Sequence, residues 1–164
     1  MAEHLRDLRN HGSWKRYHHS ELGFNSRLDE LQAVILRAKL KHIDEYNRER
    51  RRVAHRYSAA LAEMDGVTPP HEDGIGTHVY HQYTLLTSRR DEIMAALREN
   101  DIASAVYYPI PLHQQEVFAA DSRGLKLPVT EQVAEQCMSL PIFPELADDQ
   151  VDRILGVIRA TLGG

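Results

Sequence analysis

The residues with the clearest chemical potential lie in a short polar run directly before the longest helical pattern of the chain. Asn25 or Ser26 can cap that helix, because their side-chain oxygens accept hydrogen bonds from backbone N–H groups of the first turn. A helix N-terminus carries a partial positive charge, and the guanidinium of Arg27 adds donors that suit phosphate. The run therefore predicts an anion-binding site.

A plainer interpretation of the same run is also open. The residues serve only as a cap, and Arg27 is a surface charge paired with Asp29 or Glu30 in the first turn of the helix. Local physics alone favours this second interpretation. The pattern that surrounds the run has to decide between them.

The helix that follows is predicted to cover residues 28–64, as one long helix with or without a kink, because no proline or glycine interrupts its apolar periodicity. Its first turns are apolar on more than one side, so we expect them to be sandwiched between two bodies. Residues 11–19, before the run, are predicted to form a loop. Trp14 and Tyr17 in that loop are expected to pack on something elsewhere in the chain or outside it.

Further along the chain, strand and helix patterns alternate and are joined by short loops. The predicted strands cover residues 79–86, 103–108 and 140–143, and the predicted helices cover 89–99, 130–137 and 148–162. Cys137 falls on an apolar helical face and is expected in the core. This order predicts the α/β class, with a small α+β-like domain and a long connecting helix packed against a small sheet.

Composition narrows the function classes. The 164 residues are 42% hydrophobic and 27% charged, with a net charge of −4, so there is no general attraction to nucleic acid or anionic membrane. The arginine-rich run at residues 48–52 is expected to be a solvated helix face. The single cysteine excludes an internal disulfide and fits a reducing compartment, and from the mixed-charge N-terminus we expect neither a signal peptide nor a membrane span. We therefore expect a cytoplasmic location.

Ten histidines raise the question of a metal site. His78 and His81 have the nearest spacing, but they fall on a predicted strand, where residues three apart face opposite sides. No cysteine or carboxylate partner stands at recognisable ligand spacing. No metal ligands are predicted.

The polar run is part of a longer ordered pattern. It reads LRNHG at 8–12, GFNSRLDELQA at 23–33, HVYHQY at 78–83, VYYPIPLH at 106–113 and SLPIFP at 139–144. This pattern closely resembles the DegT/StrS-type nucleotide-sugar aminotransferases, which depend on pyridoxal 5′-phosphate. The resemblance spans nearly the whole chain in order.

The resemblance implies the C-terminal portion of the type I aminotransferase fold. Residues 1–24 would then be the end of the large cofactor-binding domain, 25–64 the connecting helix and 65–164 the small C-terminal domain. Enzymes of this family work as dimers, and the asparagine and arginine of the motif reach across the interface toward the cofactor phosphate. Asn25 and Arg27 inherit that role by resemblance. The parent protein would transfer an amino group, from a donor such as glutamate, to a nucleotide-linked keto-sugar.

The substrate side of the site is implied by the segment that carries Tyr108 and His113. It holds two aromatic rings and an imidazole at the end of a predicted strand, and the resemblance places it near the substrate. Both residues are therefore candidates for substrate binding. For His113, a packed and hydrogen-bonded loop histidine is an equal alternative.

A lysine that carries the cofactor is required in such an enzyme. The chain contains Lys15, Lys39, Lys41 and Lys126, each of which is expected to be a solvated charge, and the family lysine belongs to the upstream large domain. No catalytic residue is therefore assigned here. The chain is expected to be a truncated product, a fragment or one part of a split enzyme, with a second copy or a chain carrying the large domain as partner. The alternative is a non-catalytic dimerisation or regulatory module.

Overall fold

A computed structural model describes residues 1–163 of the chain. It divides into two compact units, Met1–Ile43 and Asp44–Gly164. The division falls inside the region where the sequence predicts one long helix. The second unit contains the hydrophobic core, whereas the first unit has almost no buried residues.

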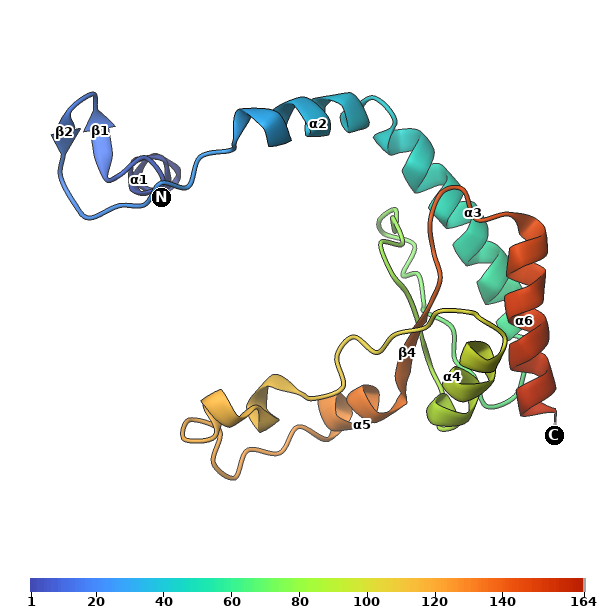
Figure 1. Cartoon of the computed structure of the whole chain (residues 1–164). Helices are drawn as coiled ribbons and strands as arrows, with labels where there is room; N and C mark the ends of the chain where they lie inside the picture. Colours follow the sequence, from blue (N-terminus) through green and yellow to red (C-terminus); the bar gives the residue numbers. More distant parts are fainter. Residues whose placement is uncertain (164) are drawn as a thin grey trace. The chain divides into compact units, whose positions relative to one another are not determined.

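The first unit begins with helix α1 (Ala2–Leu8) and a small antiparallel hairpin of β1 (Ser13–Lys15) and β2 (His18–His19), shown in blue in Figure 1. The loop predicted for residues 11–19 is therefore wrong in part. A turn with Tyr17 at φ 68° joins the two short strands. The exposed fractions of the large aromatic side chains are 62% for Trp14 and 80% for Tyr17.

Helix α2 (Glu30–Leu40) starts later than the sequence suggests. Its N-cap is Asp29, whose Oδ1 accepts hydrogen bonds from the backbone N–H groups of Leu31 at 2.7 Å and Gln32 at 3.1 Å. The prediction of Asn25 or Ser26 as the cap is wrong. An aspartate directly before the helix satisfies two first-turn donors at once, so no earlier residue is needed for that purpose.

The long predicted helix is interrupted at residues 41 and 42, after which helix α3 (Ile43–Leu61) begins. The N–H of His42 bonds to the carbonyl of Lys39, three residues back, so the last turn tightens and the α-helical ladder ends. None of the residues of α2 is buried, and Leu31 is 77% exposed. The apolar start of the predicted helix therefore has no cover within this unit.

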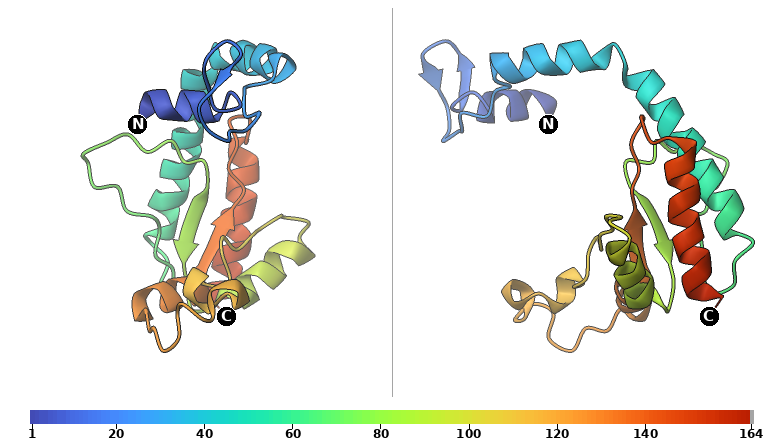
Figure 2. Two further views of the ribbon diagram at one scale, coloured as in Figure 1. Left: turned by 90° about the vertical axis from the view of Figure 1, so that its left-hand side faces the viewer. Right: turned by 45° about the vertical axis from the view of Figure 1, so that its right-hand side comes forward.

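The second unit is built around a two-stranded antiparallel sheet of β3 (Tyr83–Leu86) and β4 (Cys137–Leu140). Helices α4 (Arg90–Glu99) and α6 (Asp148–Leu162) pack against each other, and Figures 1 and 2 show α3 and α6 side by side on one side of the sheet. Single bridges at Thr68 and Ala105 extend the sheet at its edges. Helices on a small sheet confirm the predicted α/β class.

The core of this unit contains three buried tyrosines, Tyr57, Tyr80 and Tyr83, whose hydroxyls all have hydrogen-bond partners. Tyr57 donates a hydrogen bond to the carbonyl of Pro141 at 3.1 Å, and the hydroxyls of Tyr83 and Ser58 are 2.9 Å apart. Burial raises the pKa of Tyr83 to about 12, so this hydroxyl stays neutral near physiological pH. The remaining core is aliphatic, with Val53, Leu61, Leu85, Ile93, Leu97, Met138, Val151 and Ile158 all fully or almost fully buried. The buried tyrosine hydroxyls of this core therefore have hydrogen-bond partners.

Ion pairs join α3 to α6 at the surface. Arg52 pairs with Asp148, and Arg56 pairs with Asp148 at 2.7 Å and with Asp152 at 2.6 Å. The arginine-rich face predicted to be solvated is therefore partly engaged in cross-helix contacts. Being exposed, these pairs fix geometry more than they add stability.

The helix predictions at 89–99 and 148–162 are confirmed by α4 and α6. The strand predicted at 103–108 is wrong, since only Ala105 pairs there, as a bridge to Ser139. The strand predicted at 140–143 lies earlier, because Pro141 cannot donate to a strand partner. Cys137 is buried as predicted, but it begins β4 after helix α5 (Pro128–Gln136) has ended.

Replacement of Leu97 by alanine tests this core. Leu97 is fully buried in α4, so Leu97→Ala should lower the free energy of unfolding by about 2–5 kcal/mol. Urea denaturation gives the measurement. The control Ile75→Ala removes a side chain that is 90% exposed and should change stability by less than about 0.5 kcal/mol. Equal effects of the two variants would contradict this assignment of the core.

Candidate functional site

The segment that carries Asn25 is held against the turn after α1. The N–H of Phe24 donates to the carbonyl of Leu8 at 2.7 Å, and the N–H of Ser26 donates to the carbonyl of Arg9 at 2.9 Å. Between them, Asn25 forms a bridge with Asn10. The backbone on both sides of Asn25 is therefore fixed by hydrogen bonds, while its side chain is exposed.

Arg27 lies two residues further along and is exposed. Within residues 1–163, no hydrogen bond or ion pair engages its guanidinium, and the carboxylate of Asp29 is occupied by the cap of α2. The alternative in which Arg27 is only a paired surface charge does not fit this geometry. The guanidinium keeps its donors available for an anion.

The N-terminus of α2 contributes less to anion binding than the sequence suggests. Asp29 places a carboxylate on the first turn of α2 and takes up two of its free N–H groups. An anion at Arg27 therefore depends on the side chains of Asn25 and Arg27, not on an open helix N-terminus. The two residues are only two apart in the sequence, and both are exposed.

His113 lies in the short 3-10 helix η1 (Leu112–Gln114) and is largely enclosed. Its side chain is 6% exposed, and its Nε2 is 2.9 Å from Oε1 of Glu131 on α5. The same Glu131 oxygen accepts from the backbone N–H of Leu127 at 3.0 Å. Leu127 first and His113 second hold the pKa of Glu131 below its ordinary 4.5. This is the geometry of a packed, hydrogen-bonded loop histidine.

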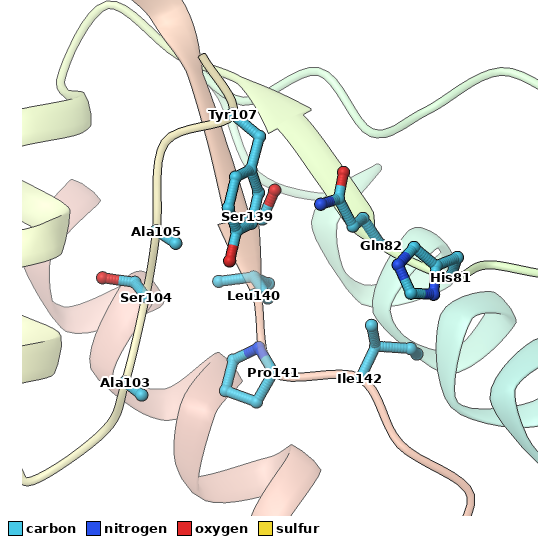
Figure 3. Close-up of a pocket in the computed structure, with 10 residues that line it drawn as sticks. All are labelled: His81, Gln82, Ala103, Ser104, Ala105, Tyr107, Ser139, Leu140, Pro141 and Ile142. Atoms are coloured by element: carbon cyan, nitrogen blue, oxygen red, sulfur yellow. The ribbon is translucent and has the colours of Figure 1, made fainter. Parts of the chain in front are cut away.

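Tyr108 is 75% exposed and lines an apolar hollow of about 370 Å³ together with Tyr107, Pro111 and Cys137. Tyr107 also lines a second hollow of about 260 Å³, drawn in Figure 3. The polar groups around that second hollow come from three segments: His81 and Gln82 before β3, Ser104 and Tyr107 after α4, and Ser139 on β4. The sequence interpretation named only Tyr108, although the adjacent pair of rings pointed equally to Tyr107.

The loop that delivers His81 and Gln82 is firmly anchored. Tyr80, directly before them, is 1% exposed and has φ 47°, which is rare for a residue with a side chain. Its hydroxyl donates to Glu72, and His55 lies 2.8 Å from the same carboxylate. The hydrogen bonds of Tyr80 and then His55 lower the pKa of Glu72. The strained backbone is thus stabilised by a partnered, buried side chain.

The site residues fall into two groups. Asn25 and Arg27 belong to the first unit, whereas Tyr108 and His113 belong to the second. Within the part of the chain that the structure describes, no group of three or more His, Cys, Asp or Glu side chains could hold a metal ion. None of the helices within residues 1–163 is long and apolar enough to cross a membrane.

Comparison of the fold with solved structures defines the class of protein. The crystal structure of DesV from S. venezuelae, in complex with a ketimine intermediate, superposes with a TM-score of 0.92 and 39% sequence identity. The match covers 97% of this chain and 43% of that one. The fold is that of an aminotransferase.

The sequence identifies the family. The pattern that defines the DegT/DnrJ/EryC1/StrS aminotransferase family matches residues 1–159, and the chain belongs to this family. It is 52% identical to the UDP-N-acetyl-3-dehydro-α-D-glucosamine 3-aminotransferase of Acidithiobacillus ferrooxidans, over 100% of this chain and 44% of that protein. It is 39% identical to the dTDP-3-amino-3,4,6-trideoxy-α-D-glucose transaminase of Streptomyces venezuelae, over 97% of this chain and 42% of that protein. The chain thus spans less than half the length of these relatives.

The lowered pKa of Glu131 predicts how the stability of the fold changes with pH. The folded carboxyl binds a proton less readily than the unfolded one, so it stabilises the fold above pH 4.5, and this contribution is lost as the pH falls through the lowered pKa. In urea, Glu131→Gln should therefore have a lower unfolding midpoint than wild type at pH 7. The difference should shrink at pH values below 4.5.

Glu135→Gln, on the exposed side of the same helix, is the control and should match wild type throughout. A difference between wild type and Glu131→Gln that stays constant from neutral to acid pH would show that the charge of Glu131 has no part in the contact.

Proposed function

We propose that the protein containing this chain is a pyridoxal-phosphate-dependent aminotransferase that acts on a nucleotide-linked keto-sugar, with an amino acid such as glutamate as donor. The observation that carries the proposal is the guanidinium of Arg27, which has no partner among residues 1–163 and lies two residues after Asn25 within the family motif. The UDP-sugar and dTDP-sugar transaminases among the relatives support the substrate class.

The side chains of Asn25 and Arg27 suit the phosphate of the cofactor. A phosphate dianion accepts hydrogen bonds from a cationic guanidinium and from a neutral amide, and the side chains of both residues are exposed. When bound, pyridoxal phosphate supplies the electron sink through which an amino group moves between two carbonyl carbons. The role of this chain is to grip the cofactor by its phosphate and so fix its position.

The lysine that carries the cofactor is proposed to come from outside this chain. Lys15, Lys39, Lys41 and Lys126 are all exposed, so none has the enclosed position that holds an amine against a cofactor ring. A second polypeptide segment, upstream or on a partner subunit, would supply it. The partner is then a second copy of the protein or a chain with the large domain.

On the substrate side, we assign the exposed ring of Tyr108 to contact with the sugar nucleotide. The enclosed His113 is assigned to hold the Tyr107–Tyr108 loop in place through Glu131, since its own ring is almost inaccessible. This retains Tyr108 as a binding residue and gives His113 an indirect part.

Replacement of Arg27 tests the phosphate role in the complete enzyme. Arg27→Ala should weaken pyridoxal phosphate binding by roughly 10- to 100-fold, which corresponds to the loss of a hydrogen bond to a charged group. The affinity for pyridoxal, which lacks the phosphate, should not change. Asn25→Ala should act in the same direction with a smaller effect, because its amide donor is neutral. Dissociation constants come from fluorescence titration.

Arg16→Ala is the matched control, since Arg16 is an exposed arginine of the same unit that stacks on Tyr17. It should leave both affinities unchanged. If Arg27→Ala bound pyridoxal phosphate as tightly as wild type does, the phosphate assignment would be wrong.

A second test concerns the division of labour between chains. Pyridoxal phosphate added to the purified 164-residue chain should give no stoichiometric absorption band of lysine-bound cofactor, because every lysine is exposed. Addition of the large domain as a separate polypeptide should produce that band and amino transfer. A stoichiometric band with this chain alone would refute the proposal that the cofactor lysine comes from outside the chain. The absence of cofactor binding after addition would instead favour the non-catalytic dimerisation or regulatory module.

A further inference from the structure

Two glycines of the first unit bring their backbones into direct contact. A Cβ atom built on Gly23 would lie 1.9 Å from the nitrogen of Gly12 and 2.6 Å from the carbonyl oxygen of Leu8. A Cβ on Gly12 would lie 1.9 Å from the carbonyl oxygen of Glu21. These neighbours are backbone atoms, which cannot rotate away as a flexible side chain can. Only glycine fits at either position.

Hydrogen bonds hold the two segments together around this contact. Gly12, at φ +70°, donates its N–H to the carbonyl of Asp7 at 2.8 Å and accepts from the N–H of Ser20 at 3.0 Å. The N–H of His11 donates to the carbonyl of Phe24 at 3.0 Å. We name this arrangement, residues 8–12 against residues 21–26, the glycine clasp.

The clasp takes the place of a core. In residues 1–43, all of which the structure describes, Gly12 is the only buried residue, so no packed side chains fix the polar run. The run is fixed at one end by the clasp and at the other by Asp29 at the start of α2. Asn25 and Arg27 lie between these two points.

We propose that Gly12 and Gly23 are positioning residues for the phosphate-binding side chains of Asn25 and Arg27, and that they act through the backbone that carries these two residues. The inference rests on the function proposed above. A side chain at either glycine forces the two backbones apart, which breaks the hydrogen bonds on both sides of Asn25. The segment with Asn25 and Arg27 then has to become ordered when the phosphate binds, and this ordering lowers the affinity.

The chain contains a matched control for each glycine. Gly76, like Gly23, has an ordinary φ, but a Cβ there meets nothing within 4 Å. Gly74, at φ +73°, matches the backbone strain of Gly12 and is also open. Gly76→Ala and Gly74→Ala therefore add the same methyl group, with the same backbone strain, without the collision.

The first measurement is amide hydrogen exchange in the 164-residue chain. Gly23→Ala and Gly12→Ala should each remove the protection of the Phe24 and Ser26 amides. The Leu86 amide, which donates to Thr68 in the second unit, should stay protected and show that this unit remains folded. Neither control should change the exchange of Phe24 or Ser26.

The second measurement is the preference for pyridoxal phosphate over pyridoxal in the complete enzyme. Both clasp variants should reduce this preference by about tenfold, in the direction of Arg27→Ala, without change in the affinity for pyridoxal. Gly76→Ala and Gly74→Ala should keep it. Because the readout is a ratio of two ligands that differ only in the phosphate, a general loss of folded protein does not produce this result.

Two results would overturn the inference while the proposed function stands. One is loss of the preference in Arg27→Ala but not in Gly12→Ala or Gly23→Ala. The other is loss of amide protection in the clasp variants with the preference intact, which would make the clasp purely structural. If Arg27→Ala itself kept the preference, the phosphate role and the positioning role would both fall.

Discussion

The contact between the backbones of Gly12 and Gly23 is the constraint that fixes the segment carrying Asn25. The first unit has no hydrophobic interior, so the usual means of fixing a binding segment, packed side chains, is missing. Backbone contact requires glycine on both sides, together with hydrogen bonds from the residues around them. The positions of the motif therefore differ in what they do. Gly23 makes the contact, Asn25 and Arg27 present donors, and Asp29 starts the helix.

In the second unit, a packed core of side chains fixes the structure. Its sheet and helices enclose an aliphatic and tyrosine core, and polar contacts hold the loops that could meet a ligand. Tyr80, directly before His81 and Gln82, donates to Glu72, and His113, in the segment after Tyr107 and Tyr108, lies against Glu131. In both loops the enclosed residue holds the backbone and its neighbours face outward. This explains why the most conspicuous histidine of the segment is not its most accessible group.

Sequence could predict those parts of the fold that depend on local periodicity and those parts of the site that depend on an ordered motif. Helices α4 and α6 follow from apolar spacing, and the family follows from the five motif segments. The position of β4 could not be predicted, because the apolar residues around Pro141 suit a strand or a loop equally and the partner strand lies more than fifty residues away. The pairing of His113 with Glu131, and the contact of Gly12 with Glu21, are likewise set by tertiary structure that no local pattern contains.

The surface of the first unit combines two properties that bear on each other. Leu28 and Leu31 are 61% and 77% exposed, next to an arginine without a partner in the described chain. In water this costs little, since the guanidinium is solvated. Where a body covers these apolar side chains and encloses Arg27 as well, the guanidinium loses its water, and an unpaired buried charge costs several kcal/mol. An anion at Arg27 removes that cost. Under the proposed function, coverage of α2 and binding of phosphate at Arg27 would therefore be thermodynamically linked, so that each favours the other.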